Sequence, residues 1–147
     1  MGTEDKENKD MAIRKIPKET KYYSFYNANP FERRTADCPI RALSLVLEKD
    51  WKDIYKELLE LTLKTGWAIN SGENIEHYLK SLGYEKQKMP KKKDNKKYTG
   101  EEFAGMHPKG RFILNIGTHH VTALVDGKIY DIWNCTKRCV GNYWAIK

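Results

Sequence analysis

The chain has 147 residues, of which 39% are hydrophobic and 32% charged, and its formal net charge is +7. This length suits one domain with a single core. No apolar run approaches the roughly 18 residues that a membrane-spanning helix needs, and the polar start lacks the apolar centre of a signal peptide. We therefore expect a cytoplasmic protein with no membrane span and no signal peptide.

The cysteines and the positive charge indicate the redox environment and the partners of the protein. Three cysteines without a secretory signal favour reduced thiols over a disulfide framework. The positive charge is concentrated in residues 86–97, KQKMPKKKDNKK, which contain no interleaved aromatic residues. Such a run is more typical of a solvated loop than of a nucleic-acid-binding surface. We expect no membrane partner, no nucleic-acid partner and no cofactor.

Residues 1–20 are predicted to be a flexible charged leader, and residues 21–147 a single domain. The segment YYSFYNANPFERR, residues 22–34, is aromatic and then turn-forming. A helix is predicted next in TADCPIRALSLVLEK, residues 35–49, where apolar residues recur at helical spacing. Asp37 is its candidate N-cap, since Pro39 is tolerated in the first turn.

Three more helices are predicted before the character of the chain changes. Two of them lie in residues 50–66, with Asp50 as the cap, and in residues 72–83. After the basic loop, Thr99 and Glu102 have the spacing of a capping box for a short helix.

Short β-type runs then follow in residues 111–116, 119–125 and 128–133, with a fourth in residues 142–146. Helices first and antiparallel strands afterwards indicate an α+β domain.

A hairpin is predicted around residues 126–127, an Asp-Gly pair between two alternating apolar runs. With a two-residue turn, Thr122 lies opposite Asp131 and His120 lies opposite Trp133. Because side chains alternate between the faces of a strand, these four residues share one face. His120 and Asp131 are then diagonal neighbours.

An imidazole beside a carboxylate is the base and orienting group of a nucleophilic site. Trp133 could shield the pair from water. His119 lies on the opposite face, across from Asn134, although a one-residue change of register would exchange the two histidines. The alternative is a polar sheet edge without catalytic function.

Cys38 is the candidate nucleophile. A thiol in the first turn of a helix lies at the positive end of the helix macrodipole, which favours the thiolate. Asp37 opposes this effect if its carboxylate points toward the sulfur. A free cysteine is also commonly a small buried apolar residue, so Cys38 gains significance only together with the hairpin.

The chain order of cysteine, histidine and aspartate resembles that of papain-like thiol hydrolases. DIW at residues 131–133 looks like an aspartate version of the Asn-x-Trp element of that family, and DCPIRAL at residues 37–43 resembles the Asp-Cys start of bacteriocin-leader peptidases. From about Tyr23 onward, the chain is similar to a group of bacterial and phage-borne proteins assigned to the same fold. The segments that carry this similarity are residues 26–58, 120–135 and 140–144.

The resemblance implies a papain-like fold, in which N-terminal helices pack on a C-terminal antiparallel sheet. It also implies a cysteine peptidase, or another amide or isopeptide hydrolase, with Cys38, His120 and Asp131 as the triad. The substrate would be a peptide or protein. Trp133, His119, Asn134 and Asp37 are the candidate supporting residues.

One position departs from the family pattern. Glu32 stands where papain-like enzymes commonly have a glutamine that helps to bind the oxyanion. A carboxylate would repel an oxyanion, so Asn27 or Asn29, with the backbone N–H of Cys38, are the candidate donors. Glu32 also favours the alternative of a catalytically inactive papain-like binding module.

Two further hypotheses rest on single features. Cys135, Cys139 and His119 supply three soft ligands, but the sequence offers no fourth, and we expect no metal. Nucleic-acid binding is supported by charge alone.

Overall fold

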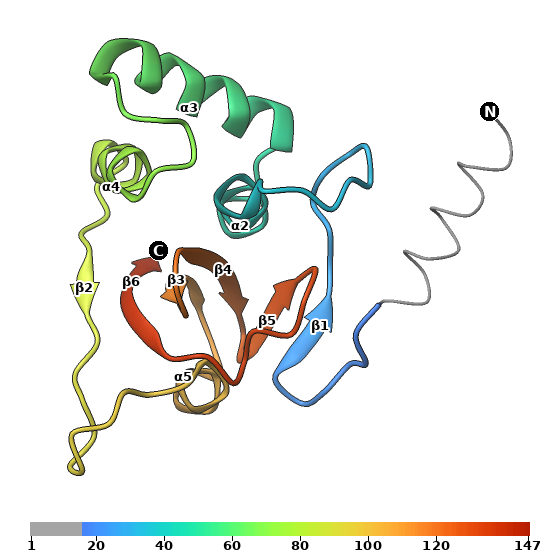
Figure 1. Cartoon of the computed structure of the whole chain (residues 1–147), viewed down its shortest axis with the longest axis vertical. Helices are drawn as coiled ribbons and strands as arrows, with labels where there is room; N and C mark the ends of the chain where they lie inside the picture. Colours follow the sequence, from blue (N-terminus) through green and yellow to red (C-terminus); the bar gives the residue numbers. More distant parts are fainter. Residues whose placement is uncertain (1–15) are drawn as a thin grey trace, which may run out of the picture.

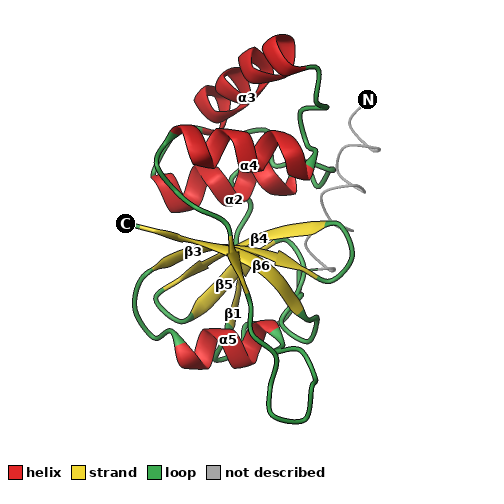
Figure 2. Cartoon of the chain, turned by 90° about the vertical axis from the view of Figure 1, so that its left-hand side faces the viewer, coloured by secondary structure: helices red, strands yellow, loops and turns green. Residues whose placement is uncertain are grey.

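A mixed sheet forms the centre of the structure, with helices on both of its faces (Figures 1 and 2). The computed structural model describes residues 16–147. Within these residues the sheet has six strands in the order β1-β5-β4-β3-β6-β2. The strands are β1 (Tyr23–Phe25), β2 (Gln87–Lys88), β3 (Arg111–Ile116), β4 (His120–Val125), β5 (Lys128–Asp131) and β6 (Val140–Ile146).

The helices fall into two unequal layers. One face of the sheet carries α2 (Cys38–Leu47), and α3 and α4 pack beyond it; α5 (Gly100–Met106) covers the other face (Figure 2). The bounds of α3 are Trp51–Thr65 and those of α4 are Gly72–Ser81. The predicted α+β class is therefore confirmed, as are the four predicted helices.

Local sequence signals explain where these helices begin and end. The side chain of Asp50 accepts a hydrogen bond from the backbone N–H of Lys52 at the start of α3. Gly66, with φ of 80°, ends α3 in the left-handed conformation that a glycine adopts without strain. Thr99 and Glu102 form both hydrogen bonds of the predicted capping box before α5.

The hairpin has the predicted register. Val125 pairs with Lys128, and Ala123 pairs with Tyr130. The turn residues Asp126 and Gly127 both have positive φ, 48° and 78°, as a type I′ turn requires. Strand β5 ends at Asp131, two residues earlier than predicted.

The arrangement differs from the predicted one at both edges of the sheet. Strand β1 precedes helices α2 to α5 in the chain and pairs parallel with β5, so the sheet is neither purely antiparallel nor purely C-terminal. Strand β2 lies within the basic segment and pairs antiparallel with β6. Two- and three-residue strands are too short to show an alternating pattern, and only their hydrogen bonds to the sheet define them.

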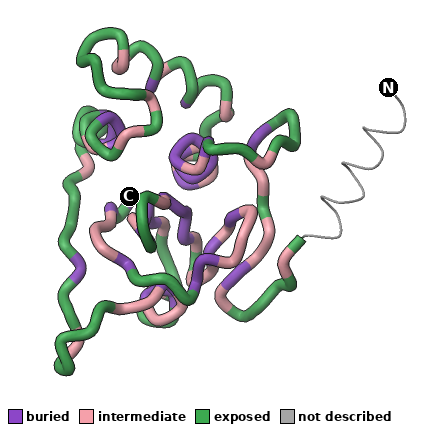
Figure 3. The backbone as a smooth tube through the Cα atoms, viewed as in Figure 1, coloured by how far each residue is buried: buried purple, intermediate pink, exposed green. Residues whose placement is uncertain are grey.

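The two faces of the sheet bury separate apolar clusters. One lies under α2, α3 and α4 and includes Ile40, Leu43, Leu58 and Trp144. The other lies under α5 and includes Phe103, Leu114, Leu124 and Ile129. Figure 3 shows buried backbone in α2 and in the central strands.

The predicted leader falls for the most part outside the described residues, which begin at residue 16. At its predicted end, Thr20 forms a bridge with Tyr23, and Glu19 pairs with Lys128 of β5. Within residues 16–147, each helix is too short or too polar to cross a bilayer.

Candidate functional site

Three elements bring the predicted triad to one edge of the α2 face. Helix α2 begins at Cys38, β4 begins at His120, and β5 ends at Asp131. Helix α2 packs on β4 and β5. Cys38 lies 82 positions before His120 and 93 before Asp131 in the chain, yet the three residues come from adjacent elements.

His120 and Asp131 form a close ion pair across the hairpin. Nε2 of His120 lies 2.7 Å from Oδ2 of Asp131, and the same oxygen accepts a hydrogen bond of 2.6 Å from Oγ1 of Thr122. The side chain of Asp131 is 1% exposed and that of His120 is 12% exposed. The predicted facing of His120, Thr122 and Asp131 is thus what the side chains adopt.

The second oxygen of Asp131 has two donors of its own. Nη1 of Arg41 donates to Oδ1 at 2.9 Å, and the backbone N–H of Ile132 donates at 2.7 Å. Burial raises the pKa of Asp131, but hydrogen bonding and charge from His120, together with Thr122 and Arg41, outweigh burial and lower it. Asp131 is therefore an ionised carboxylate in the folded protein.

The environment of His120 favours its charged form. Burial lowers the pKa of His120, but the hydrogen bond with Asp131, hydrogen bonding with Cys135 and Cys38, and the charge of Asp131 together raise it to about 11. His120 is accordingly an imidazolium at neutral pH. The Trp133 ring lies beside the His120 ring, with ring centroids 4.8 Å apart and planes inclined by 51°.

Two thiols, those of Cys38 and Cys135, lie next to the His120 side chain. Cys38 is half-buried at the start of α2, whereas Cys135 is 0% exposed. Burial is the main reason why the pKa of Cys135 is raised, so Cys135 remains a protonated thiol. Because Nε2 of His120 is taken by Asp131, Nδ1 is the ring nitrogen left for a nucleophile. Cys38 is the more exposed of the two thiols.

Asp37 occupies the N-cap position of α2, but its side chain makes no capping hydrogen bond. Oδ1 accepts from Nε of Arg41 at 2.8 Å. Oδ2 accepts from Nδ2 of Asn29 at 3.1 Å and from Nε1 of Trp51 at 2.9 Å. The predicted capping role is wrong because these side-chain donors hold the carboxylate, and the Arg41 cation balances its charge.

The other candidate residues have local roles. The amide of Asn27 donates to the backbone oxygen of Arg33, and Oδ1 of Asn134 accepts from the backbone N–H and the hydroxyl of Thr136. Glu32 is exposed in the turn that follows Asn29, with φ of 56°. His119 is also exposed, with φ of 57°, in the turn before β4.

The structure changes the candidate metal site. Among residues 16–147, the group with ligand atoms close enough to share an ion is His120, Asp131 and Cys135, within 4.8 Å of one another. The combination of His119, Cys135 and Cys139 is not brought together in this way. The residues fit a cation poorly, since both oxygens of Asp131 already accept hydrogen bonds and Arg41 places a positive charge beside them.

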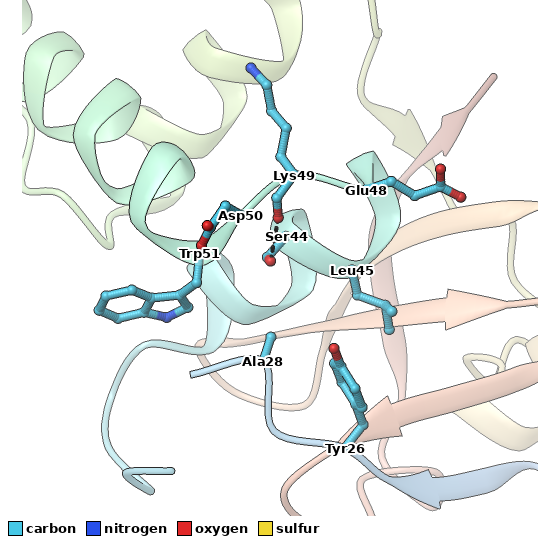
Figure 4. A pocket seen from close by; sticks show the side chains of 8 residues that line it. All are labelled: Tyr26, Ala28, Ser44, Leu45, Glu48, Lys49, Asp50 and Trp51. Carbon is cyan, nitrogen blue, oxygen red and sulfur yellow. Dashed lines mark hydrogen bonds between the residues drawn. The ribbon is translucent and has the colours of Figure 1, made fainter. Parts of the chain in front are cut away.

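A shallow hollow of ≈ 420 Å³ lies beside α2 (Figure 4). Its wall includes Tyr26, Leu45, Glu48 and Trp51, but not Cys38, His120 or Asp131. Trp51 joins the hollow to the site, since its indole N–H binds Asp37, the residue before Cys38.

Sequence reasoning missed Arg41, and it considered Cys135 only as a metal ligand with Cys139 and His119. Arg41 stands four residues after Asp37, the spacing of an ion pair on one helix face, and this signal could have found it. Cys135 carried no such signal, because its position follows from the loop between β5 and β6.

No family model matches the chain, and comparison with curated proteins and with solved structures gives no significant match. The resemblance to papain-like hydrolases therefore stays a prediction.

Proposed function

We propose that this protein is a papain-like thiol hydrolase that cleaves an amide or isopeptide bond in a peptide or protein. The observation that carries the proposal is the placement of His120 between an ionised, fully buried Asp131 and the partly accessible thiol at the start of α2. A nucleophile, a base and an orienting carboxylate within reach of one another are the minimum of such a site.

In this mechanism Cys38 attacks the substrate carbonyl as a thiolate, with its proton held on His120. The imidazolium then gives that proton to the leaving amine as the C–N bond breaks, which leaves an acyl-thioester on Cys38. Water attacks the thioester, His120 takes its proton, and the acid product departs as the thiol re-forms. Asp131 keeps the His120 ring oriented and stabilises its positive charge throughout.

The oxyanion would be bound by the backbone at the start of α2. The first N–H groups of a helix have no partner within the helix, and the N–H of Cys38 is one of them. The side-chain amides of Asn27 and Asn29 donate to Arg33 and Asp37, so the backbone donor carries more of this role than the sequence suggested.

The test is the rate at which iodoacetamide alkylates each cysteine, measured by mass spectrometry between pH 5 and pH 9. We expect Cys38 to react at pH 6 about 10- to 100-fold faster in the wild type than in His120→Ala, because a free thiol, with a pKa of about 8.5, is almost fully protonated there. His119→Ala is the matched control and should leave the rate unchanged. The proposal fails if Cys38 reacts no faster than exposed Cys139.

An inactive binding module is the second candidate, favoured by Glu32 in place of a donor and by the use of both asparagine amides in the loop. It predicts that no peptide substrate acylates Cys38, and rapid, selective alkylation of Cys38 would count against it. Incubation with a library of peptide thioesters separates the two: turnover supports the hydrolase, and saturable binding without acylation supports the module. A catalytic thiol also needs a reducing environment, and we place either activity in the cytoplasm.

A further inference from the structure

Four charged side chains form a continuous buried chain behind the thiol. Asp37, Arg41, Asp131 and His120 alternate in sign and are joined by contacts of 2.8, 2.9 and 2.7 Å. The Arg41 side chain is 7% exposed, and those of Asp37 and Asp131 are 6% and 1% exposed. Arg41 is the internal cation of this chain, and it touches both carboxylates.

The chain of charges connects the element that carries the thiol to the element that carries the acid. Asp37 directly precedes Cys38, Arg41 lies one turn further along α2, and Asp131 ends β5. Arg41 uses two different nitrogens, Nε for Asp37 and Nη1 for Asp131. A planar guanidinium can hold two carboxylates in fixed directions, which an ammonium cannot do in the same way.

Stability alone does not account for an arginine at this position. The other buried residues of α2 are apolar: Pro39, Ile40, Ala42, Leu43 and Val46. Buried ion pairs commonly stabilise a protein no more than well-packed apolar residues of similar volume. An apolar residue at position 41 could complete the helix face, but it would leave Asp131 without its cation.

We propose that Arg41 is a positioning residue, which fixes the Asp131 carboxylate toward His120 and locks it to the helical turn that carries Cys38. This inference rests on the proposed function. Without Arg41, two buried carboxylates would lose their shared cation, and Asp131 would be free to rotate or take up a proton. His120 would then lose the anion that keeps its ring oriented and charged.

The groups that face Arg41 and Asp131 come from each of the elements packed around them. Asp37 and Cys38 approach from the start of α2, His120 from β4 and Cys135 from the loop after β5. Tyr23 of β1 donates its hydroxyl to the backbone oxygen of Asp131, and burial raises the pKa of this tyrosine. Arg41 is the cation among them that touches both carboxylates.

The test compares Arg41→Met and Arg41→Lys with Arg111→Met, a control at an arginine that contacts the other end of α2. Nη1 of Arg111, on β3, donates to the backbone oxygen of Val46, and its side chain pairs with Glu48. Arg111→Met therefore also removes an arginine that ties α2 to the sheet. We expect Arg41→Met to slow alkylation of Cys38 at pH 6 by about 10-fold or more, Arg41→Lys to fall between it and the wild type, and Arg111→Met to match the wild type.

A double variant separates charge balance from packing. In an Asp131→Asn background the carboxylate that Arg41 is proposed to position is gone, although Asp37 remains. Arg41→Met should then slow the alkylation of Cys38 by less than about 2-fold further. Equal slowing in both backgrounds would overturn the proposal, as would equal slowing by Arg41→Met and Arg111→Met. If Arg41→Met does not unfold cooperatively, Arg41→Lys carries the test, and a wild-type rate in this variant would overturn the inference.

The inference and the proposed function fail in different ways. If Cys38 of the wild type reacts no faster than Cys139, the proposed function fails, and the inference fails with it. If the wild-type thiol is activated and Arg41→Met leaves its rate and pH profile unchanged, the hydrolase proposal stands and the role of Arg41 is overturned.

Discussion

The two faces of the sheet differ in what they bury. The face under α5 buries aliphatic and aromatic side chains such as Phe103, Leu114 and Ile129. The face under α2 buries an apolar cluster too, but at its edge it also buries the charges of Asp37, Arg41 and Asp131. The charged edge is where α2 begins and where β5 ends.

This difference separates a face that supplies stability from an edge where we propose that the chemistry takes place. Apolar burial is favourable without regard to direction, so the α5 face can be packed by many combinations of residues. Buried charges are costly unless each has partners in the right geometry. Among residues 16–147, the buried charged side chains are those of Asp37, Arg41 and Asp131, and for this reason we propose the edge of α2 as the functional region.

The largest expected effect is a core deletion on the α5 face. The Phe103 ring stacks on His107 at 4.2 Å between centroids and contacts Tyr143 at 5.0 Å. Phe103→Ala should lower the free energy of unfolding by about 3–5 kcal/mol, as measured by urea denaturation. The alkylation rate of Cys38 should not change while the protein is folded. Leu59→Ala, on an exposed part of α3, is the control and should cost far less.

Slower alkylation of Cys38 in folded Phe103→Ala would show that the two faces are energetically coupled at the site. It would contradict the separation of the two faces.

The next effect comes from a nearly isosteric change on the charged edge. Thr122→Val removes the 2.6 Å hydrogen bond to Asp131, and hydrogen bonds to charged groups typically contribute about 1.5–3 kcal/mol. We expect a loss of that size in the free energy of unfolding, together with slower alkylation of Cys38 at pH 6. The matched control is Thr136→Val, which removes a 2.6 Å hydrogen bond to the neutral Asn134.

Thr136→Val should destabilise the protein without affecting Cys38. Identical alkylation rates in both variants would mean that the hydroxyl of Thr122 only fills space.

The smallest expected effect is the change in the free energy of unfolding per pH unit. The unfolded chain releases the His120 proton near pH 6.5, whereas the folded protein keeps it until about pH 11. The stabilisation is therefore complete below pH 6.5 and declines above it, by at most about 1.4 kcal/mol per pH unit. The lowered pKa of Asp131 acts at the other end, because its contribution is lost as the pH falls below the unfolded value of 3.8.

Denaturation curves at pH 7, 8 and 9 for the wild type and His120→Gln test the first part of this prediction. The wild type should lose stability faster than the variant over this interval. Parallel curves would show that His120 is neutral in the folded protein.

Local patterns predicted much of the fold. The caps at Asp50 and Thr99 and the turn at Asp126 depend on residues close in the chain, and all three form as predicted. The hairpin register follows from that turn, and with it the contact of His120 with Asp131. His119 was predicted to lie on the opposite face of the strand, but it lies in the turn before β4, which begins at His120.

The partners of the charges were decided only by the tertiary structure. The sequence suggested that Asp37 caps its helix, but Trp51 and Asn29 approach its carboxylate from other elements, and Arg41 balances it. Strand β1 pairs with β5 although their paired residues, Tyr23 with Ile129 and Phe25 with Asp131, lie 106 positions apart in the chain. The hydrogen bonds that join these two strands leave no periodic signal in the sequence. Burial is a property of the assembled molecule, and burial determines which side chains need a partner and which charges persist. For that reason the chain alone determined the candidate triad, whereas the packing of α2 on the sheet determined the charges around it.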